Sequence, residues 1–297
     1  MISRLSERTR GELALIAVTL VWGASFVLVK ATLEHISTWL FLAARFTVAA
    51  VVLLLFFGRR IGAAEGRGTA LRAGMWAGLC LAGGFCFQTF GLRYTTPSKS
   101  AFITGLTSAL VPFLAFLVYR KAPRPSEVLG VAMATVGLGL LTMPAGTLAI
   151  GYGDAITLCC TVAFAGHILL LGRFAHAVPF ELLSVTQVAV TAAVCWIMAG
   201  WAEAPYAAQR ASVLGAILFT GVLCTAIPFT VQAWAQRHTT PTRTALIFAF
   251  EPVAAMITSY LALGETLTAR SGWGAFLILA GVLTVELKPA PGPKHPS

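Results

Sequence analysis

The sequence predicts an all-α polytopic membrane protein of ten transmembrane helices, arranged as two inverted five-helix repeats with both termini in the cytoplasm. Three observations predict this fold: the composition, the length of the apolar runs, and a short motif that occurs twice at a fixed spacing. Of 297 residues, 58% are apolar and only 11% are charged, whereas roughly 25% are charged in an ordinary soluble domain. A composition this apolar is typical of a chain that resides in a lipid bilayer.

Ten apolar runs are each long enough to cross roughly 30 Å of hydrocarbon as a helix. They are too continuously apolar for the alternating strands of an outer-membrane barrel, so helices are the expected spanning elements. A basic leader precedes the first run, but no small-residue cleavage site follows it, and we expect an uncleaved first helix. The ten runs are 12–31, 37–58, 72–92, 98–119, 126–144, 151–173, 179–200, 211–235, 241–263 and 270–287.

The orientation follows from the basic residues, which gather in cytoplasmic segments. Fifteen Lys and Arg residues fall on the side of the N-terminus, five fall on the opposite side, and Arg45 lies within a span. Both termini are therefore expected in the cytoplasm. This bias accounts for the net charge of +10, so a nucleic-acid partner is not needed to explain it. All six cysteines lie within spans, where thiols behave as small hydrophobes, and neither disulfides nor a zinc site is expected.

The repeated motif reads RYTTPSKSA at residues 93–101 and RHTTPTRTA at residues 237–245, 144 positions later. Gly130 and Gly137 meet Gly274 and Gly281 at the same spacing. We therefore expect two repeats, residues 1–145 and 146–288, followed by a cytoplasmic tail over residues 289–297. Five spans is an odd number, so the second repeat enters the membrane from the opposite side. This is the architecture of many secondary transporters, which bind their substrate near the midplane.

The chemistry of the motif explains why each copy begins a helix. Thr96 and Thr240 are placed as N-caps, and the proline after each occupies the first helical position, where no N–H is required. Lys99 and Arg243 then lie in the first turn, where the helix dipole disfavours a cation by about 0.3–1 kcal/mol. Something must compensate. The sequence favours contact with lipid phosphate, and the alternative is an anionic substrate group held at a gate.

Few polar side chains lie deep within spans, where they normally face a bundle interior or an aqueous cavity. Gln88 and Gln232 occupy matching places, and their amides suit a zwitterion in an apolar cavity. The alternative is a helix-to-helix hydrogen bond worth about 0.6–1 kcal/mol. Aromatic residues, with Trp22 matched to Phe164, would form the walls. The predicted cavity residues are Trp22, Ser25, Phe26, Phe85, Gln88, Thr104, Phe164, His167, Gln232, Trp234 and Phe250.

Four charged residues are candidates for gating or coupling: Lys99, Arg243, Glu251 and Arg45. Glu251 precedes Pro252, which can kink the helix. Its carboxyl group could carry a proton during the cycle, or it could be a fixed structural tie, neutral or paired, with Arg45 as one partner; the sequence favours the tie. No metal site is expected at His167, which lacks a second ligand at i+3 or i+4. No nucleotide-binding or catalytic motif is present, so neither a cofactor nor enzyme activity is expected.

The tail FEPVAAMITSYLALGETLTARSGWGAFLILAGVLTVEL, from Phe250 to Leu287, resembles the second-repeat signature of the drug/metabolite transporter superfamily, in its ten-helix EamA-type family of bacterial metabolite exporters. VWGASFVLVK at residues 21–30, Arg45 and VPFLAFLVYRKAPRPSEVLG resemble further parts of the family pattern. Two features depart from it: Arg120-Lys121 replaces a common Gly-Glu, and Phe164 and His167 replace a common tryptophan and tyrosine. The carriers of the signature are Glu251-Pro252, Gly264-Glu265, Leu267-Thr268, Gly274 and Gly281.

This resemblance implies a secondary transporter of the bacterial inner membrane that exports small metabolites by alternating access. The pattern is similar to that of aromatic amino acid exporters, so amino acids with aromatic or apolar side chains are the favoured substrates. Expected partners are such a solute and the lipid bilayer, with proton coupling left open. One alternative is an exporter of hydrophobic or cationic drugs, against which the shortage of deep carboxylates argues. Another is a membrane enzyme or assembly subunit without a transport cycle.

Overall fold

The first half of the chain forms six helices in the computed structural model, which describes residues 6–62, 67–120, 122–142, 150–202, 204–263 and 268–286. Most of the predicted spans correspond to one continuous helix. The fourth span is instead divided at Leu106 into two consecutive helices. The helices are α1 (Glu7–Thr32), α2 (Thr38–Gly62), α3 (Arg67–Tyr94), α4 (Pro97–Gly105), α5 (Thr107–Tyr119) and α6 (Pro125–Thr142).

The second half forms a similar series of helices. The eighth and ninth spans of the chain, which belong to this half, are interrupted. A π-helical turn lies within the eighth span. The ninth span is broken before Pro252, which has no N–H and whose ring would clash with the carbonyl group of Phe248 in a continuous helix. The elements are α7 (Tyr152–Phe174), α8 (Phe180–Trp201), α9 (Ala211–Gly221), the π-helix η2 (Val222–Ala226), α10 (Ile227–Ala235), α11 (Pro241–Phe248), α12 (Glu251–Leu263) and α13 (Ala269–Glu286).

The helices confirm the predicted all-helical, polytopic membrane fold. Among the described residues, seven helical runs are long and apolar enough to cross a membrane, and two shorter apolar helices, Pro125–Leu141 and Ala269–Val285, coincide with the predicted fifth and tenth spans. The predicted tail at 289–297 and the signature residues Gly264 and Glu265 lie outside the described residues, as does Lys121.

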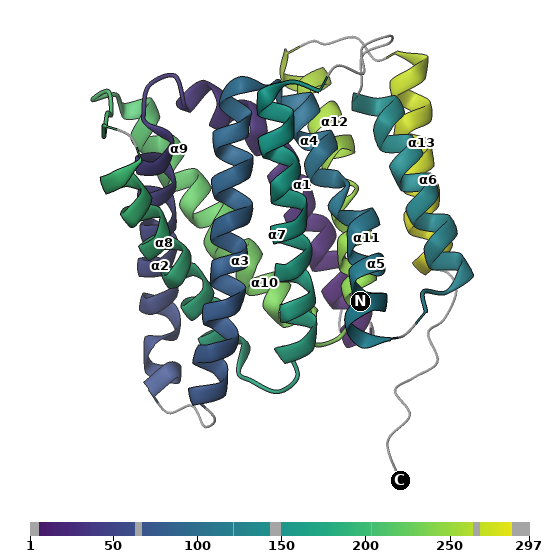
Figure 1. Cartoon of the computed structure of the whole chain (residues 1–297), viewed down its shortest axis with the longest axis horizontal. Helices are drawn as coiled ribbons and strands as arrows, with labels where there is room; N and C mark the ends of the chain where they lie inside the picture. The colour runs from purple at the N-terminus through teal and green to yellow at the C-terminus, as the bar shows by residue number, and fades with distance from the viewer. Residues whose placement is uncertain are drawn as a thin grey trace.

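The closest helix pairs each take one helix from either half of the chain. Helix α3 packs along α7, α6 along α13, and α2 along α8. Figure 1 shows α6 and α13 side by side at one edge of the bundle, with α2, α8 and α9 at the opposite edge and α1, α7, α10 and α11 between them. The two halves therefore share one interior.

Facing glycines explain the close approach of α6 and α13. A Cβ atom on Gly137 would lie 2.6 Å from the backbone oxygen of Gly274, and one on Gly274 would lie 2.6 Å from that of Gly137. A Cβ atom on Gly130 would lie 2.7 Å from the backbone oxygen of Gly281, and one on Gly281 would lie 2.5 Å from that of Gly130. Small residues let helix backbones approach in membranes. The four glycines that share the repeat spacing therefore form the contact between these two helices.

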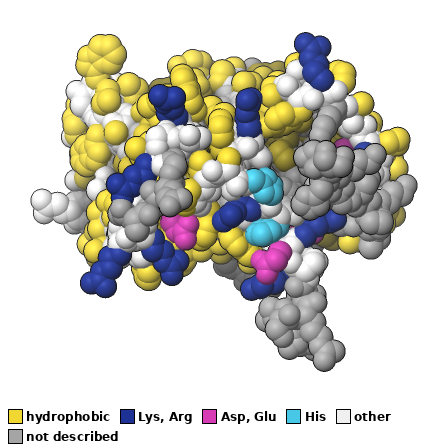
Figure 2. All heavy atoms as spheres, turned by 90° about the horizontal axis from the view of Figure 1, so that it is seen from below, with side chains coloured by type: hydrophobic (Ala, Val, Ile, Leu, Met, Phe, Trp, Pro, Cys, Tyr) yellow, Lys and Arg dark blue, Asp and Glu magenta, His cyan; other side chains and the backbone are white. Residues whose placement is uncertain are grey.

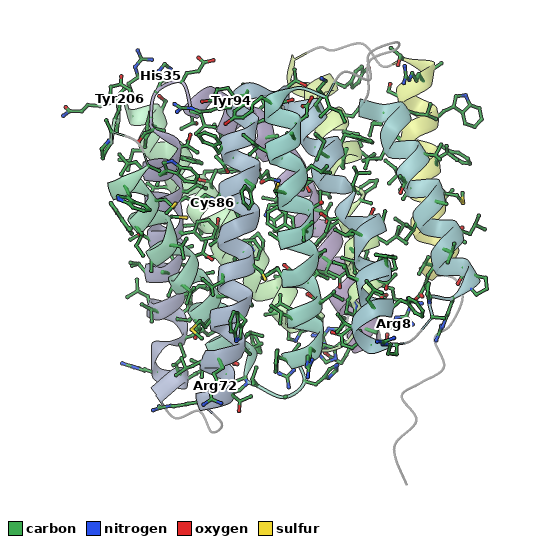
Figure 3. All side chains as sticks on the ribbon, viewed as in Figure 1. Arg8, His35, Arg72, Cys86, Tyr94 and Tyr206 are labelled. Carbon is green, nitrogen blue, oxygen red and sulfur yellow. The ribbon has the colours of Figure 1, made fainter. Side chains whose placement is uncertain are left out.

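The two ends of the bundle differ in the residues that they present. Helix α1 begins and α13 ends at the same end (Figure 1). Figure 2 looks onto this end, where Lys and Arg side chains are spread over the surface. In Figure 3, Arg8 and Arg72 lie at this end, while His35, Tyr94 and Tyr206 lie at the other. That the basic end faces the cytoplasm stays a prediction.

Candidate transport cavity

A cavity lies inside the bundle and is lined by side chains from both halves of the chain. Its volume is about 90 Å³, on the scale on which one water molecule takes up roughly 10–15 Å³. It therefore holds several waters or one small solute. Nine of the eleven predicted cavity residues line it: Trp22, Ser25, Phe26, Phe85, Gln88, Thr104, Phe164, His167 and Gln232.

Aromatic rings form one wall of the cavity. The ring of Phe85 makes edge-to-face contacts with Phe46, Phe164 and Phe229, at centroid distances of 5.1, 5.4 and 5.8 Å. Edge-to-face packing of this kind fixes ring orientation and contributes about 0.5–1.5 kcal/mol per pair beyond area burial. Phe164 reaches Phe85 because the neighbouring Gly84 has no side chain: a Cβ atom there would lie 2.4 Å from the Phe164 ring. The wall is therefore rigid and apolar.

The π-helical turn supplies a carbonyl group that anchors two cavity side chains. Pro228 lies four residues after Cys224 and has no N–H, so it cannot donate the usual helical hydrogen bond to the Cys224 oxygen. Trp22 Nε1 donates to this oxygen at 2.9 Å, and Arg45 Nη2 donates to it at 3.1 Å. Arg45 Nε also donates to Thr225 Oγ1 at 2.7 Å. A proline thus creates the acceptor that positions both side chains.

The two predicted amides each donate a hydrogen bond, and one of them has an unsatisfied oxygen. Gln88 Nε2 donates to Thr104 Oγ1 at 3.0 Å, which joins α3 to α4. Gln232 Nε2 donates to Gln236 Oε1 at 3.1 Å, while its own buried Oε1 has no hydrogen-bond partner among the described residues. A buried acceptor without a partner costs about 1–3 kcal/mol. This oxygen is itself enclosed by protein atoms, so it does not face the open space of the cavity.

His167 has the partner that an imidazole within a membrane span requires. Its Nε2 lies 2.7 Å from Gln187 Oε1 on α8. The ring also meets Phe229 edge-to-face at a centroid distance of 5.7 Å. His167 is fully enclosed, with 1% of its surface exposed. It joins α7 to α8 and forms part of the cavity lining.

Lys99 belongs to a cluster of three polar side chains at one end of the bundle. Lys99 Nζ lies 3.1 Å from Asp154 Oδ2 at the start of α7. The hydroxyl group of Thr95 also bonds to the Asp154 carboxylate, and Thr96 Oγ1 caps α4 by accepting from the Lys99 backbone N–H at 3.2 Å. Here the expected N-cap is confirmed. We call Thr95, Lys99 and Asp154 the lysine cluster.

Arg243 belongs to a matching cluster at the opposite end. Its Nη1 lies 3.3 Å from Glu12 Oε1 on α1, and Thr239 Oγ1 donates to the same oxygen at 2.9 Å. Arg243 Nη2 also donates to the Val285 oxygen at 3.0 Å. Thr240 Oγ1 caps α11 through the Arg243 N–H at 3.3 Å. We call Thr239, Arg243 and Glu12 the arginine cluster.

Comparison with known proteins identifies the family. The model of the EamA-like transporter family matches this chain twice, over residues 9–143 and 151–287. The chain belongs to the EamA-like transporter family. It is a multi-pass membrane transporter, not an enzyme, as the sequence predicts.

Relatives of this EamA-like transporter share its full length. An uncharacterized transporter of Archaeoglobus fulgidus is 29% identical over 282 residues, which cover 95% of this chain and 87% of that protein. The uncharacterized transporter YyaM of Bacillus subtilis is 29% identical over 286 residues, with 92% of each chain covered. One crystal structure matches 94% of this chain and 97% of its own at 20% identity with a TM-score of 0.78, which shows a shared fold.

Two predicted cavity residues of the transporter lie away from the cavity, and these predictions are corrected. Trp234 packs with Leu15 on α1 and contacts His238 at a centroid distance of 5.5 Å. Phe250 packs beside Leu138 of α6 instead. Gln232 on the same helix does line the cavity, and a residue two positions along a helix points to a different face. Phe250 lies in the break between α11 and α12, where helical spacing no longer predicts direction.

Two predictions about charged partners are also corrected. The sequence favoured lipid phosphate as the partner of Lys99 and Arg243, but both pair with carboxylates of the protein, and Arg243 has only 4% of its side chain exposed. The suggested tie between Arg45 and Glu251 does not form: no ion pair within 4.0 Å joins them, although both side chains line the cavity.

Sequence reasoning missed Glu12 and Asp154, the carboxylates of the two clusters. The signal that finds them is a spacing of 142 residues, which relates Glu12 to Asp154 as it relates Trp22 to Phe164. The two family matches begin at residues 9 and 151, with the same spacing. Phe229, which contacts both Trp22 and Phe85, was missed because an isolated phenylalanine resembles a lipid-facing one.

Proposed function

We propose that this EamA-like transporter exports amino acids with aromatic or other apolar side chains across the bacterial inner membrane. One observation carries the proposal: one small cavity combines a wall of aromatic rings with a few polar groups, those of Gln88, Arg45 and Glu251 among them. Ligand sites are typically apolar with a few placed polar groups. The wall around Phe85 suits an apolar side chain, and the polar groups of the lining suit the charged groups of an amino acid.

A transport cycle by alternating access is part of the proposal. We propose residues 1–145 and 146–288 as inverted repeats that rock about the cavity, as in other transporters built from such repeats. The lysine cluster joins the first half to α7, and the arginine cluster joins the second half to α1. Each cluster thus links the two halves at one end of the bundle. We propose that they close the two gates in turn.

Export of cationic drugs is the competing function within transport. Glu251 is the single Asp or Glu among the described lining residues of the cavity, and Arg45 lines it too. A cationic solute would meet one carboxyl group and one guanidinium group, so its net electrostatic gain is small. A substrate that carries both charges fits this lining better than a cation does.

Accumulation of radiolabelled amino acids in cells tests the proposed function. Overproduction of the transporter should lower the internal level of aromatic amino acids, and the double variant Gln88→Ala/Gln232→Ala should largely abolish the effect. Gln209→Ala is the matched control, because Gln209 is exposed in the segment between α8 and α9. Unchanged internal levels upon overproduction, with the protein present in the membrane, would refute export of aromatic amino acids.

A further inference from the structure

Arg45 carries a guanidinium group inside the bundle that forms no ion pair with a carboxylate of the described residues. Its side chain is 4% exposed, and no Asp or Glu among the described residues lies within 4.0 Å of it. Its contacts are neutral: Thr225, the Cys224 oxygen, and the ring of Phe85, whose centroid lies 4.7 Å from Cζ. These contacts use Nε and Nη2. Nη1 has no hydrogen-bond partner among the described residues and remains available for an anionic group.

Glu251 supplies a carboxyl group to the same cavity. It lies at the first position of α12, where a helix dipole favours a negative group, and no hydrogen bond or ion pair to another described side chain is formed. A Cβ atom on Gly23 would lie 2.6 Å from the Glu251 backbone oxygen. This close contact brings α1 against the break between α11 and α12. Glu251 is therefore fixed in position while its carboxyl group stays unpaired.

The two charges lie near each other without touching. Both side chains line the same cavity, yet no ion pair within 4.0 Å joins them. Burial of an unpaired charge is costly. A bound molecule with a carboxylate and an ammonium group would balance both charges at once, whereas an amine or an acid alone would leave one of them unpaired.

We propose that Arg45 binds the carboxylate of the substrate and Glu251 its ammonium group, so that the cavity selects zwitterionic amino acids over amines and acids with the same side chain. This inference rests on the proposed function and names the residues that select the backbone of the substrate. Arg45 offers Nη1 as a charge-assisted donor. Thr225 is a positioning residue, because its hydroxyl group and the freed carbonyl group of Cys224 hold the guanidinium group in place.

Transport in proteoliposomes tests this assignment with three solutes that share one ring. L-phenylalanine carries both charged groups, 3-phenylpropionate lacks the ammonium group, and phenethylamine lacks the carboxylate. The wild-type protein should prefer L-phenylalanine to either analogue by about 10- to 100-fold, the factor for losing one hydrogen bond to a charged group. Arg45→Met should remove the preference over phenethylamine, and Glu251→Gln should remove the preference over 3-phenylpropionate.

Further variants guard against loss of the folded state. Arg45→Lys keeps the positive charge and should retain part of the preference for L-phenylalanine. Thr225→Val keeps the arginine but removes one of the two groups that position it, and should weaken transport of both carboxylates while that of phenethylamine is unchanged. A merely structural Arg45 would lower transport of all three solutes equally, and this result would overturn the assignment, as would a wild-type preference for phenethylamine.

A different result would refute the proposed function itself. If the wild-type protein moves none of the twenty amino acids in counterflow, amino acid transport is refuted, and the substrate class named here falls with it. If L-phenylalanine is transported and Arg45→Met keeps the wild-type preference over phenethylamine, the function stands and the role of Arg45 is refuted. The two failures are therefore distinguishable.

Discussion

The two threonines of each Thr-Thr-Pro motif have different partners. The second one, Thr96 or Thr240, caps a helix by accepting a backbone N–H. The first one bonds instead to a carboxylate from the other half of the chain: Thr95 to Asp154 and Thr239 to Glu12. The motif therefore specifies both the start of a helix and its attachment to a distant helix.

The pair formed by His167 and Gln187 gives a prediction about stability. Gln187→Leu should lower the free energy of unfolding by about 1–3 kcal/mol, because it leaves a buried imidazole nitrogen without a partner. The double variant His167→Phe/Gln187→Leu should lose less than the two single variants together, since no polar group is then left unpaired. Reversible unfolding in detergent micelles measures the free energy of unfolding of the wild-type protein, the two single variants and the double variant. Additive losses would show that the two side chains act independently.

The sequence identified the polar residues that need partners, but it did not identify the partners. Lys99 and Arg243 stand out as cations in the first turn of a helix, where they are unfavourable. Asp154 does not stand out in this way, because acidic residues are common near the start of a helix, where the dipole favours them. Pairing between residues 55 positions apart is set by the packing of α4 against α7, which a local pattern does not contain.

At the scale of elements, long apolar runs predicted the spans and failed to predict their interruptions. The break before Pro252 was foreseen as a kink. The π-helical turn over Val222–Ala226 was not, since Pro228 is equally consistent with a plain kink. Arg120 is a further example: it ends α5 with a φ of 56°, a conformation that favours glycine. An arginine at this position is therefore held with local backbone strain.

The facing glycines of α6 and α13 give a prediction about packing. Gly274→Ala should lower the free energy of unfolding by about 1–3 kcal/mol, because its Cβ atom would meet the Gly137 oxygen and force the helices apart. Gly272→Ala is the matched control on the same helix, since a Cβ atom there meets nothing within 4 Å. The control should be neutral or slightly stabilising. Equal effects of the two changes would contradict close backbone packing.

At the scale of the whole molecule, the two clusters stand at opposite ends and join opposite pairs of helices. If each cluster closes one gate, breaking it should depopulate the state in which that gate is shut. The apparent affinity for substrate falls in proportion to the population of the competent state. Removing the cation of one cluster should therefore lower the apparent affinity on one face of the membrane, and removing the cation of the other cluster should lower it on the opposite face.

Half-saturation from either face of oriented vesicles measures this effect. Arg243→Gln should weaken apparent affinity roughly tenfold for substrate added at the end of the lysine cluster, as expected for loss of one charge-assisted hydrogen bond. Lys99→Gln should do the same for substrate added at the other end. In the control, the exchange Lys99→Asp/Asp154→Lys restores an ion pair and should recover most of the affinity. Equal effects on both faces would show that the clusters are structural only.

The two clusters are equivalent in sequence and unequal in surroundings. The arginine cluster excludes water, with 4% and 12% of its charged side chains exposed, whereas Lys99 is 30% exposed. Exposed ion pairs are weakened by dissolved salt, and enclosed ones are weakened far less. Ionic strength would therefore loosen one end of the empty carrier selectively. The salt concentration would then influence which side of the membrane the empty transporter opens to. Two identical repeats with identical surroundings could not respond in this way.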